Sequence, residues 1–141
     1  MKDFNFYAPT RVVFGRNSEE QLPQLIRQYG GTKVLVHYGG GSARRSGLLD
    51  KVEQMLGEAG ISYVELGGVV PNPLLSKVNE GIVLCRQEGV DFILAVGGGS
   101  VIDSSKAIGY GANYEGDVWD FWDGRGAPQS CLPVGVMLTI P

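Results

Sequence analysis

The chain has 141 residues, of which 43% are hydrophobic and 19% are charged, so it is long enough for one globular domain and too short for two ordinary ones. Its formal net charge of −3 offers no basic field to nucleic acid or to an anionic membrane. The sequence contains no run of about eighteen apolar residues and no signal-peptide core near its N-terminus. We therefore expect a cytoplasmic protein with no membrane span, and its two cysteines are expected to be reduced.

Apolar runs that predict strands alternate with patterns that predict helices. In chain order, the predicted elements are a strand at residues 11–14, a helix at 22–29, a strand at 33–38, a helix at 47–59, a strand at 63–66, a helix at 74–88, a strand at 92–96, a helix at 100–109 and a strand at 134–139. Pro23 falls in the first turn of its helix, where proline is tolerated. Helix C-cap glycines are expected at Gly30, Gly60, Gly89 and Gly111.

This alternation indicates parallel βαβ units, whose right-handed crossovers place helices on both faces of a sheet. The second, fourth and fifth predicted strands are nearly continuous in apolar residues, which predicts burial on both faces. The sequence therefore predicts an α/β fold with a Rossmann-like, doubly wound, mainly parallel sheet that forms a single domain over residues 1–141.

A glycine run follows the strand predicted at 92–96. Gly97, Gly98 and Gly99 lack a Cβ, so their backbone can take positive φ values and approach an anion closely. Ser100 is expected to cap the next helix, with Asp103 three residues on in a capping box, so that free amides face the loop. Lys106 shares a helix face with Asp103. These residues predict a phosphate site, although a plain tight turn with a capped helix and a solvated lysine is the alternative.

Two common phosphate motifs do not fit this loop. The third glycine of a G-x-G-x-x-G fingerprint would fall on Ile102, and no Gly-Lys-Ser/Thr follows as in a Walker A loop. On its own, a glycine run after a strand is as typical of a tight turn as of a ligand site.

A second Gly-Gly-Gly-Ser run follows the strand predicted at 33–38. Both loops should lie at the carboxyl edge of one parallel sheet, where open α/β sheets bind ligands. Gly39, Gly40 and Ser42 offer no carboxylate to an adenosine ribose, whereas Arg44 and Arg45 could meet a 2′-phosphate. This pattern favours NADP(H) over NAD(H), and the alternative is that the two arginines begin a solvated helix.

The segment GGGSVIDSSKAIG at residues 97–109 resembles the cofactor loop of the iron-containing (group III) alcohol dehydrogenases, a family that includes butanol dehydrogenases and aldehyde reductases. Further blocks occur in the family's order over the whole chain. They are FNFYAPTRVVFG at 4–15, YGGGSARRSGLLDKV at 38–52, PNP at 71–73, GDVWDFWDG at 116–124 and LPVGVMLTIP at 132–141.

The resemblance implies several site residues. It places Asp103 at the nicotinamide end of the cofactor and the substrate cleft, as the candidate catalytic residue, and it places Asn72 and Thr139 near the cofactor. Family members with Gly-Gly-Gly-Ser at 39–42 resemble the NADP-dependent branch, whereas those with aspartate at Gly39 favour NAD. The implied partners are a nicotinamide dinucleotide, a small alcohol or aldehyde, and a second copy in a homodimer that pairs through the strand at 11–14.

The resemblance also implies a divalent iron or zinc ion held by an aspartate and three histidines of a C-terminal helical domain. His37 is the only histidine here and lies inside a predicted strand, which indicates a structural role, so the metal ligands and that domain are absent from this chain. We expect the chain to be the cofactor-binding part of a metal-dependent dehydrogenase that is inactive alone. The alternatives are a stand-alone dinucleotide-binding module and a relative of glycerol dehydrogenase or dehydroquinate synthase.

Overall fold

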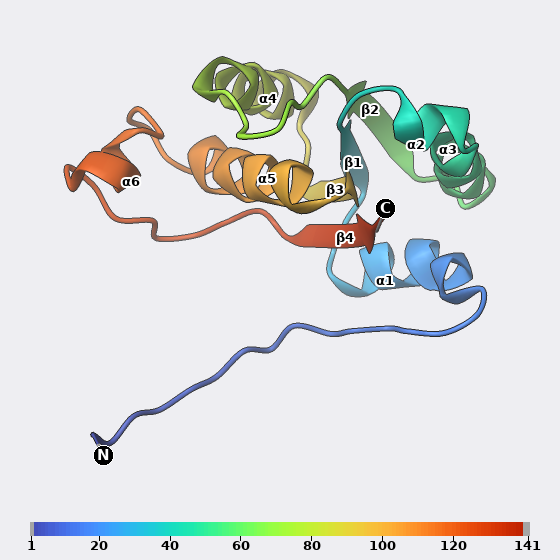
Figure 1. Ribbon diagram of the computed structural model, residues 1–141, viewed down its shortest axis with the longest axis horizontal. Coiled ribbons are helices and arrows are strands. Elements are labelled where there is room, and N and C mark those ends of the chain that lie inside the picture. The colour runs from blue at the N-terminus through green and yellow to red at the C-terminus, as the bar shows by residue number, and fades with distance from the viewer. Residues whose placement is uncertain (1, 140–141) are drawn as a thin grey trace.

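The computed structural model describes residues 2–139 and contains a parallel sheet covered by helices on both faces (Figure 1). The strands are β1 (Lys33–Tyr38), β2 (Ser62–Leu66), β3 (Phe92–Gly97) and β4 (Val134–Leu138). The helices are α1 (Leu22–Gln28), α2 (Ser42–Arg45), α3 (Leu48–Glu58), α4 (Leu75–Glu88), α5 (Gly99–Ala112) and α6 (Asp120–Asp123), and a 3-10 turn, η1 (Ser18–Gln21), precedes α1. The predicted α/β fold with a Rossmann-like parallel sheet is confirmed.

Within residues 2–139 the strand order is β2-β1-β3-β4, and every pairing is parallel. The chain leaves β1 toward β2 on one side and returns to β3 on the other, so the winding reverses between β1 and β3. Tyr38 pairs with Val96 at the carboxyl ends of these two strands. Doubly wound sheets bind ligands at such a reversal, so the loops that follow β1 and β3 are the first place to look for a site.

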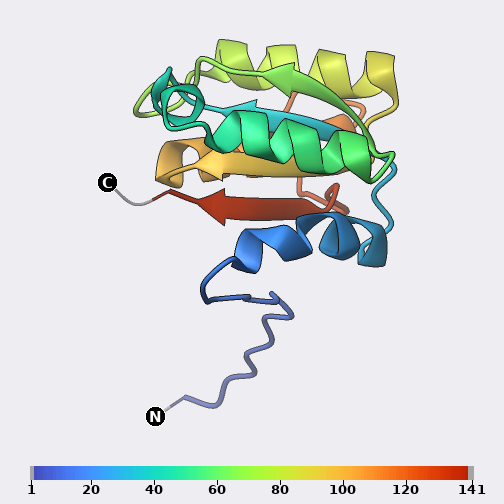
Figure 2. The ribbon, with the colours of Figure 1, turned by 90° about the vertical axis from the view of Figure 1, so that its right-hand side faces the viewer.

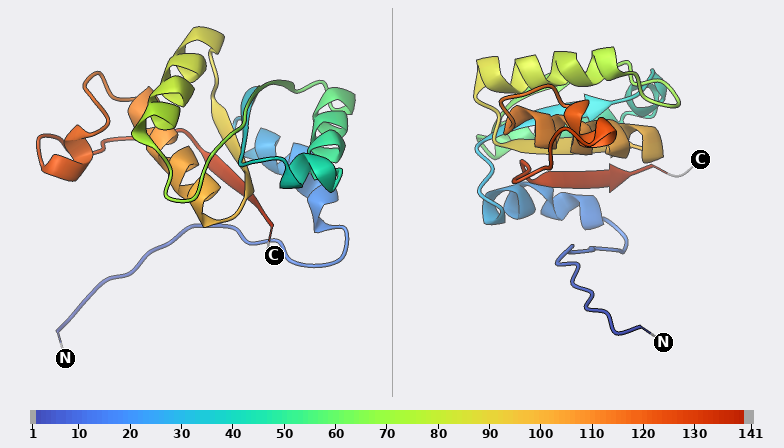
Figure 3. Two further views of the ribbon diagram at one scale, coloured as in Figure 1. Left: turned by 45° about the horizontal axis from the view of Figure 1, so that its top comes forward. Right: turned by 90° about the vertical axis from the view of Figure 1, so that its left-hand side faces the viewer.

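Two layers of helices bury the two faces of the sheet, α1 and α3 on one and α4 and α5 on the other (Figure 3). Alternate residues of β1 serve the two faces: Val34 and Val36 pack toward α1 and α3, whereas Leu35 packs toward α4 and α5. Each fully buried aliphatic side chain contributes about 1.5–3 kcal/mol to folding. These layers form the rigid support for the loops at the carboxyl edge.

Residues 11–14 do not form the predicted strand. The segment from 2 to 14 has no helix or strand and runs away from the sheet (Figure 2). A strand needs a partner for its backbone groups, and residues 2–139 provide none for this segment. Phe14 is almost fully exposed as a result, as are Phe4 and Tyr7.

The predicted burial of the last strand is also wrong in part. Strands β1 and β3 are buried as expected. Strand β4, however, is one of the two outer strands over residues 2–139, and its Val136 and Leu138 are 46% and 57% exposed. The apolar pattern of an edge strand does not reveal which strand lies at the edge.

Helix α5 is longer than predicted, and Gly111 lies inside it instead of capping it. A Cβ at Gly111 would overlap Ile82 of α4, so this glycine permits the close packing of α4 on α5. The other three glycines have positive φ values just after their helices, as expected. Within residues 2–139, no helix has the length and the apolar character that a membrane crossing requires.

Candidate functional site

The candidate site begins where β3 passes into α5. Gly97 has a φ of 156°, Gly98 is extended at φ −99° and ψ −162° as the N-cap, and Gly99 is the first residue of the helix. The predicted capping by Ser100 and Asp103 is wrong, because the N-cap is Gly98, two residues before Ser100, and no side chain caps the helix. The backbone N–H groups of the first turn are therefore left without a side-chain acceptor.

The space in front of these N–H groups is open. A Cβ built on Gly98 would meet only the Thr139 carbonyl oxygen, at 4.0 Å, and one built on Gly99 would meet nothing within 4 Å. Gly97 differs, since a Cβ there would lie 2.7 Å from Cγ2 of Val101. Gly97 is thus needed for packing against Val101. Gly98 and Gly99 instead leave an open space in front of the helix, here called the cradle, which side chains at these positions would fill. A diphosphate fits such a cradle, because free amides and the positive end of a helix dipole favour an anion.

Thr139 lies beside this cradle. Its N–H donates to the carbonyl oxygen of Gly97 at 3.0 Å, which continues the β3–β4 pairing past the end of β4. The structure thus brings Thr139 to the glycine loop. Ile140 and Pro141, which follow it, lie outside the described residues.

The first glycine loop lies beside the second, because β1 and β3 are adjacent and end level. The Gly39 carbonyl oxygen accepts from the Gly68 N–H at 2.8 Å, so the loops that follow β1 and β2 are joined. A Cβ on Gly39 would lie 3.3 Å from the Val69 carbonyl oxygen, and one on Gly40 would meet nothing within 4 Å. Ser42 is exposed at the start of α2, a short helix that contains both arginines, as in the alternative stated for this pattern.

Arg44 does not face this loop as a free cation. Its guanidinium donates to Glu65 at 2.7 Å and to Glu53 and Asp50 at 3.2 Å, and it lies 5.7 Å from the Tyr38 ring centre. A hydrogen bond with Glu65 raises the pKa of Glu53 above its usual range, and burial acts in the same direction. These carboxylates are not evident from the sequence, since no spacing rule links residue 65 at the end of β2 to a helix that follows β1.

Asp103 and Lys106 lie on the exposed side of α5 and line a hollow of about 480 Å³ between α4, α5 and α6. The other contributors include Pro73, Tyr110, Trp119 and Trp122. The two tryptophan rings stack with centres 6.0 Å apart and are about half exposed. The structure thus brings Asp103, Lys106 and the aromatic loop together, as a mixed polar and apolar surface.

Asn72 lies in the loop that leads from β2 to α4, immediately before Pro73. Its φ is 55°, a left-handed value that asparagine tolerates better than most residues. Its side chain is exposed, and the loop follows the carboxyl end of β2. Asn72 therefore lies at the edge of the sheet that carries both glycine loops.

His37 is fully buried in β1 on the α4 and α5 side of the sheet. Its Nδ1 lies 2.7 Å from the Leu66 carbonyl oxygen, and its Nε2 lies 2.8 Å from the Ser104 hydroxyl oxygen. Burial lowers the pKa of His37 to about 4, so the ring is neutral at pH 7. This arrangement supports the structural role that the sequence indicates.

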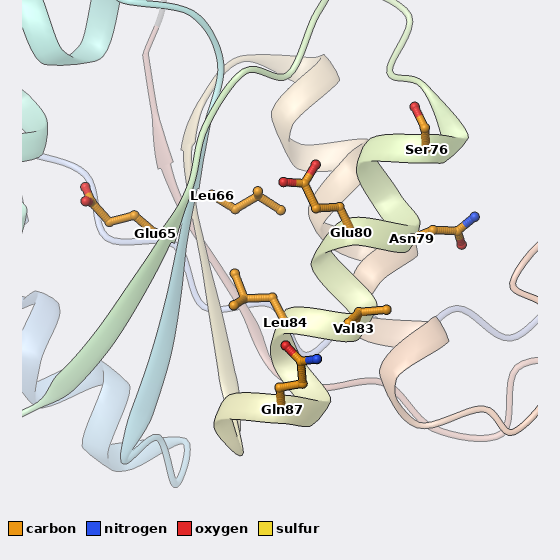
Figure 4. Close-up of a pocket in the computed structure, with 8 residues that line it drawn as sticks. All are labelled: Glu65, Leu66, Ser76, Asn79, Glu80, Val83, Leu84 and Gln87. Atoms are coloured by element: carbon orange, nitrogen blue, oxygen red, sulfur yellow. The ribbon is translucent and has the colours of Figure 1, made fainter.

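A second hollow, of about 520 Å³, lies away from the glycine loops, along the outer side of α4 and the edge of β2 (Figure 4). Its lining is mixed, with Glu80, Asn79 and Gln87 beside Val83 and Leu84, and Glu65 lies on the other side of β2 (Figure 4). It contains no residue of either glycine loop.

The residues described hold no group of three or more His, Cys, Asp or Glu side chains that could bind a metal ion.

Comparisons with known proteins identify the family of the chain. A family model described as iron-containing alcohol dehydrogenase matches residues 9–141. The chain is 49% identical over 140 residues to the probable NADH-dependent butanol dehydrogenase 1 of Bacillus subtilis, covering 99% of this chain and 36% of that protein. It is 38% identical over 148 residues to the NADPH-dependent aldehyde reductase YqhD of Escherichia coli, covering 100% of this chain and 36% of that protein.

The crystal structure of NADH-dependent butanol dehydrogenase A from Thermotoga maritima superimposes with a TM-score of 0.95 at 46% identity, over 99% of this chain and 35% of that one. The chain thus spans about a third of the length of these relatives. The family match over residues 9–141 and these similarities together establish that the chain belongs to the iron-containing alcohol dehydrogenase family.

Proposed function

We propose that residues 1–141 form the dinucleotide-binding domain of a metal-dependent dehydrogenase that transfers a hydride between NADP(H) and a primary alcohol or aldehyde. The observation that carries this proposal is that no side chain caps the N-terminus of α5 and that the space beside Gly98 and Gly99 is open. A diphosphate bound there would accept hydrogen bonds from the first-turn amides. The two adjoining glycine loops then provide room for the cofactor on both sides of the diphosphate.

In this proposal each part of the edge has its own task. Gly39, Gly40 and Ser42 border the adenosine ribose, and Gly97, Gly98, Gly99 and Ser100 surround the diphosphate. Asn72 and Thr139 border the path of the cofactor. Asp103 and Lys106 lie beyond the diphosphate, toward the hollow lined by Trp119 and Trp122, and Asp103 orients the nicotinamide end and the substrate there. The bound cofactor supplies or accepts the hydride.

A preference for NADP(H) over NAD(H) is part of the proposal. Its support is the absence of a side chain at Gly39, where a carboxylate would repel a 2′-phosphate, and the presence of two arginines on α2. The relatives' names include both NADH-dependent and NADPH-dependent enzymes. Since Arg44 is held by carboxylates, we expect a preference of about tenfold, at the low end of what charge-assisted contacts allow.

The alcohol or aldehyde chemistry of the whole enzyme, with its iron or zinc ion, is proposed for a longer protein that contains this domain. A homodimer is also proposed, and its support is the exposed apolar segment at residues 2–14, where Phe4, Phe6 and Phe14 lack cover within the described chain. Sedimentation of the chain with and without residues 1–14 tests this part, because deletion should then yield monomers.

Titration of the 141-residue chain with NADPH, followed by quenching of tryptophan fluorescence, tests the binding function. Trp119 and Trp122 border the proposed nicotinamide side, so binding should quench them. ATP is the matched control, because it has an adenosine and phosphates but no nicotinamide. Quenching by NADPH and much weaker quenching by ATP are expected, and no response to NADPH up to millimolar concentrations would contradict the proposal.

A further inference from the structure

The two arginines of α2 have different surroundings, although they are adjacent in sequence. Arg44 is bonded to three carboxylates, and the side chain of Glu65 is its nearest partner, at 2.7 Å. Within residues 2–139, Arg45 forms no ion pair and no side-chain hydrogen bond. The two positive charges are therefore not equally available to a ligand.

Arg45 lies against the first glycine loop. A Cβ built on Gly41 would be 2.5 Å from Nη1 of Arg45 and 3.4 Å from its Cζ, so the guanidinium covers the backbone at this position. Gly40, the preceding residue, has nothing within 4 Å of an added Cβ. An exposed cation thus borders an open space at the carboxyl end of β1.

The neighbourhood of Arg44 would not attract a dianion. Its one positive charge faces three carboxylates, those of Glu65, Glu53 and Asp50. A 2′-phosphate that took Arg44 would leave these carboxylates unpaired beside its own negative charge. Arg44 therefore remains with its carboxylates and links α2 to α3 and β2.

We propose that Arg45, and not Arg44, contacts the 2′-phosphate of NADP(H), and that Glu65 and Glu53 hold Arg44 away from the cofactor. This assignment rests on the proposed dinucleotide function, and it names the residue that sets the cofactor preference. It narrows the sequence-based expectation that both Arg44 and Arg45 could meet the 2′-phosphate. The preference then comes from one exposed cation, which explains why it should be modest.

The test compares dissociation constants for NADPH and NADH, measured by calorimetry, in the 141-residue chain and two variants. In R45M, we expect NADPH affinity to fall about tenfold and NADH affinity to change less than about twofold. The R44M/E65Q double variant is the matched control, because it removes one cation and one anion and keeps the formal net charge at −3. It should keep the NADPH to NADH ratio within about threefold of the wild type.

Circular dichroism and thermal unfolding check that both variants fold, and methionine preserves the length of the aliphatic stem at either position. An unchanged ratio in R45M, or a tenfold loss of the ratio in R44M/E65Q, overturns the Arg45 assignment while dinucleotide binding itself remains established. Failure of the wild type to bind either dinucleotide overturns the proposed function, and this assignment with it.

Discussion

His37 and Ser104 are joined in the interior by a hydrogen bond of 2.8 Å between Nε2 and Oγ, which ties β1 to α5. The Leu66 carbonyl oxygen can only accept, so the proton of the neutral ring is on Nδ1, and Nε2 accepts from the Ser104 hydroxyl. Ser104 follows Asp103 in the sequence, close to the start of α5. This buried contact therefore helps to hold α5 in position behind the glycine loop.

The stability of the chain should decrease in acid because of His37. Burial lowers the pKa of His37 from 6.5 to about 4, so between these values the unfolded chain takes up a proton that the folded chain does not. The contribution of His37 to the free energy of unfolding is fully present above pH 6.5. As the pH falls to 4, the free energy of unfolding decreases by about 3 kcal/mol. Urea unfolding at a series of pH values measures how the free energy of unfolding depends on pH.

The H37Q variant is the control for that measurement, since glutamine retains a donor and an acceptor but does not titrate. Carboxylates contribute to the acid dependence of both proteins, so only the difference between them is informative. If the free energy of unfolding depends on pH in the same way in both proteins between pH 6.5 and 4, the lowered pKa of His37 is wrong.

Asp103 should be unimportant for folding, because it does not cap α5. Replacing Asp103 by alanine is expected to change the free energy of unfolding by less than about 0.5 kcal/mol, whereas loss of a true cap costs about 1 kcal/mol. Chemical denaturation of D103A decides between these values. A loss near 1 kcal/mol would restore the capping role that the sequence indicates and weaken the assignment of Asp103 to the cofactor side.

The difference between sequence and structure at this helix has a physical cause. The Gly-Gly-Gly-Ser run makes serine the best candidate for an N-cap by residue preference, but Gly98 takes the extended N-cap conformation, and the helix begins at Gly99. Intrinsic propensity does not determine where a helix begins when a strand and its neighbours already fix the preceding backbone. The central strands and their loops were predictable because long apolar runs and glycine clusters are strong local signals.

Long-range features could not be predicted in this way. Residues 11–14 have the composition of a strand but no partner within 2–139, and Val136 and Leu138 look like core residues but lie on an outer strand. The contact of Arg44 with Glu65 depends on how α2 lies over the end of β2, which no sequence spacing encodes. The site loops were therefore predictable, and the electrostatic partners around them were not.

The cofactor preference should respond to a carboxylate at the first loop. In G39D we expect NADH affinity to rise and NADPH affinity to fall, each by about three- to tenfold, because aspartate accepts from a ribose 2′-hydroxyl and repels a phosphate. G39A controls for the added Cβ, which must adjust to the Val69 carbonyl oxygen 3.3 Å away. If G39D and G39A have the same NADPH to NADH ratio, Gly39 does not border the ribose.

The isolated chain should not turn over alcohols. Residues 2–139 provide no metal-binding cluster, and the chain spans only about a third of the relatives' length. Assays with butanol or butanal, a nicotinamide cofactor and added Fe²⁺ or Zn²⁺ are expected to give no steady change in absorbance at 340 nm. Sustained metal-dependent turnover that grows with the concentration of the chain would contradict the assignment of the chemistry to a longer protein.

Comparing Gly98→Val with the unchanged chain in a calorimetric titration with NADPH tests the central claim most directly. The added Cβ at Gly98 meets only the Thr139 carbonyl oxygen, at 4.0 Å, so the variant should fold while its side chain fills the cradle and lowers NADPH affinity at least tenfold. Gly97→Val differs, because its φ of 156° and the contact with Val101 should destabilise the fold itself by at least about 1–2 kcal/mol. A folded Gly98→Val protein that binds NADPH as tightly as the wild type would show that the diphosphate does not bind at the start of α5.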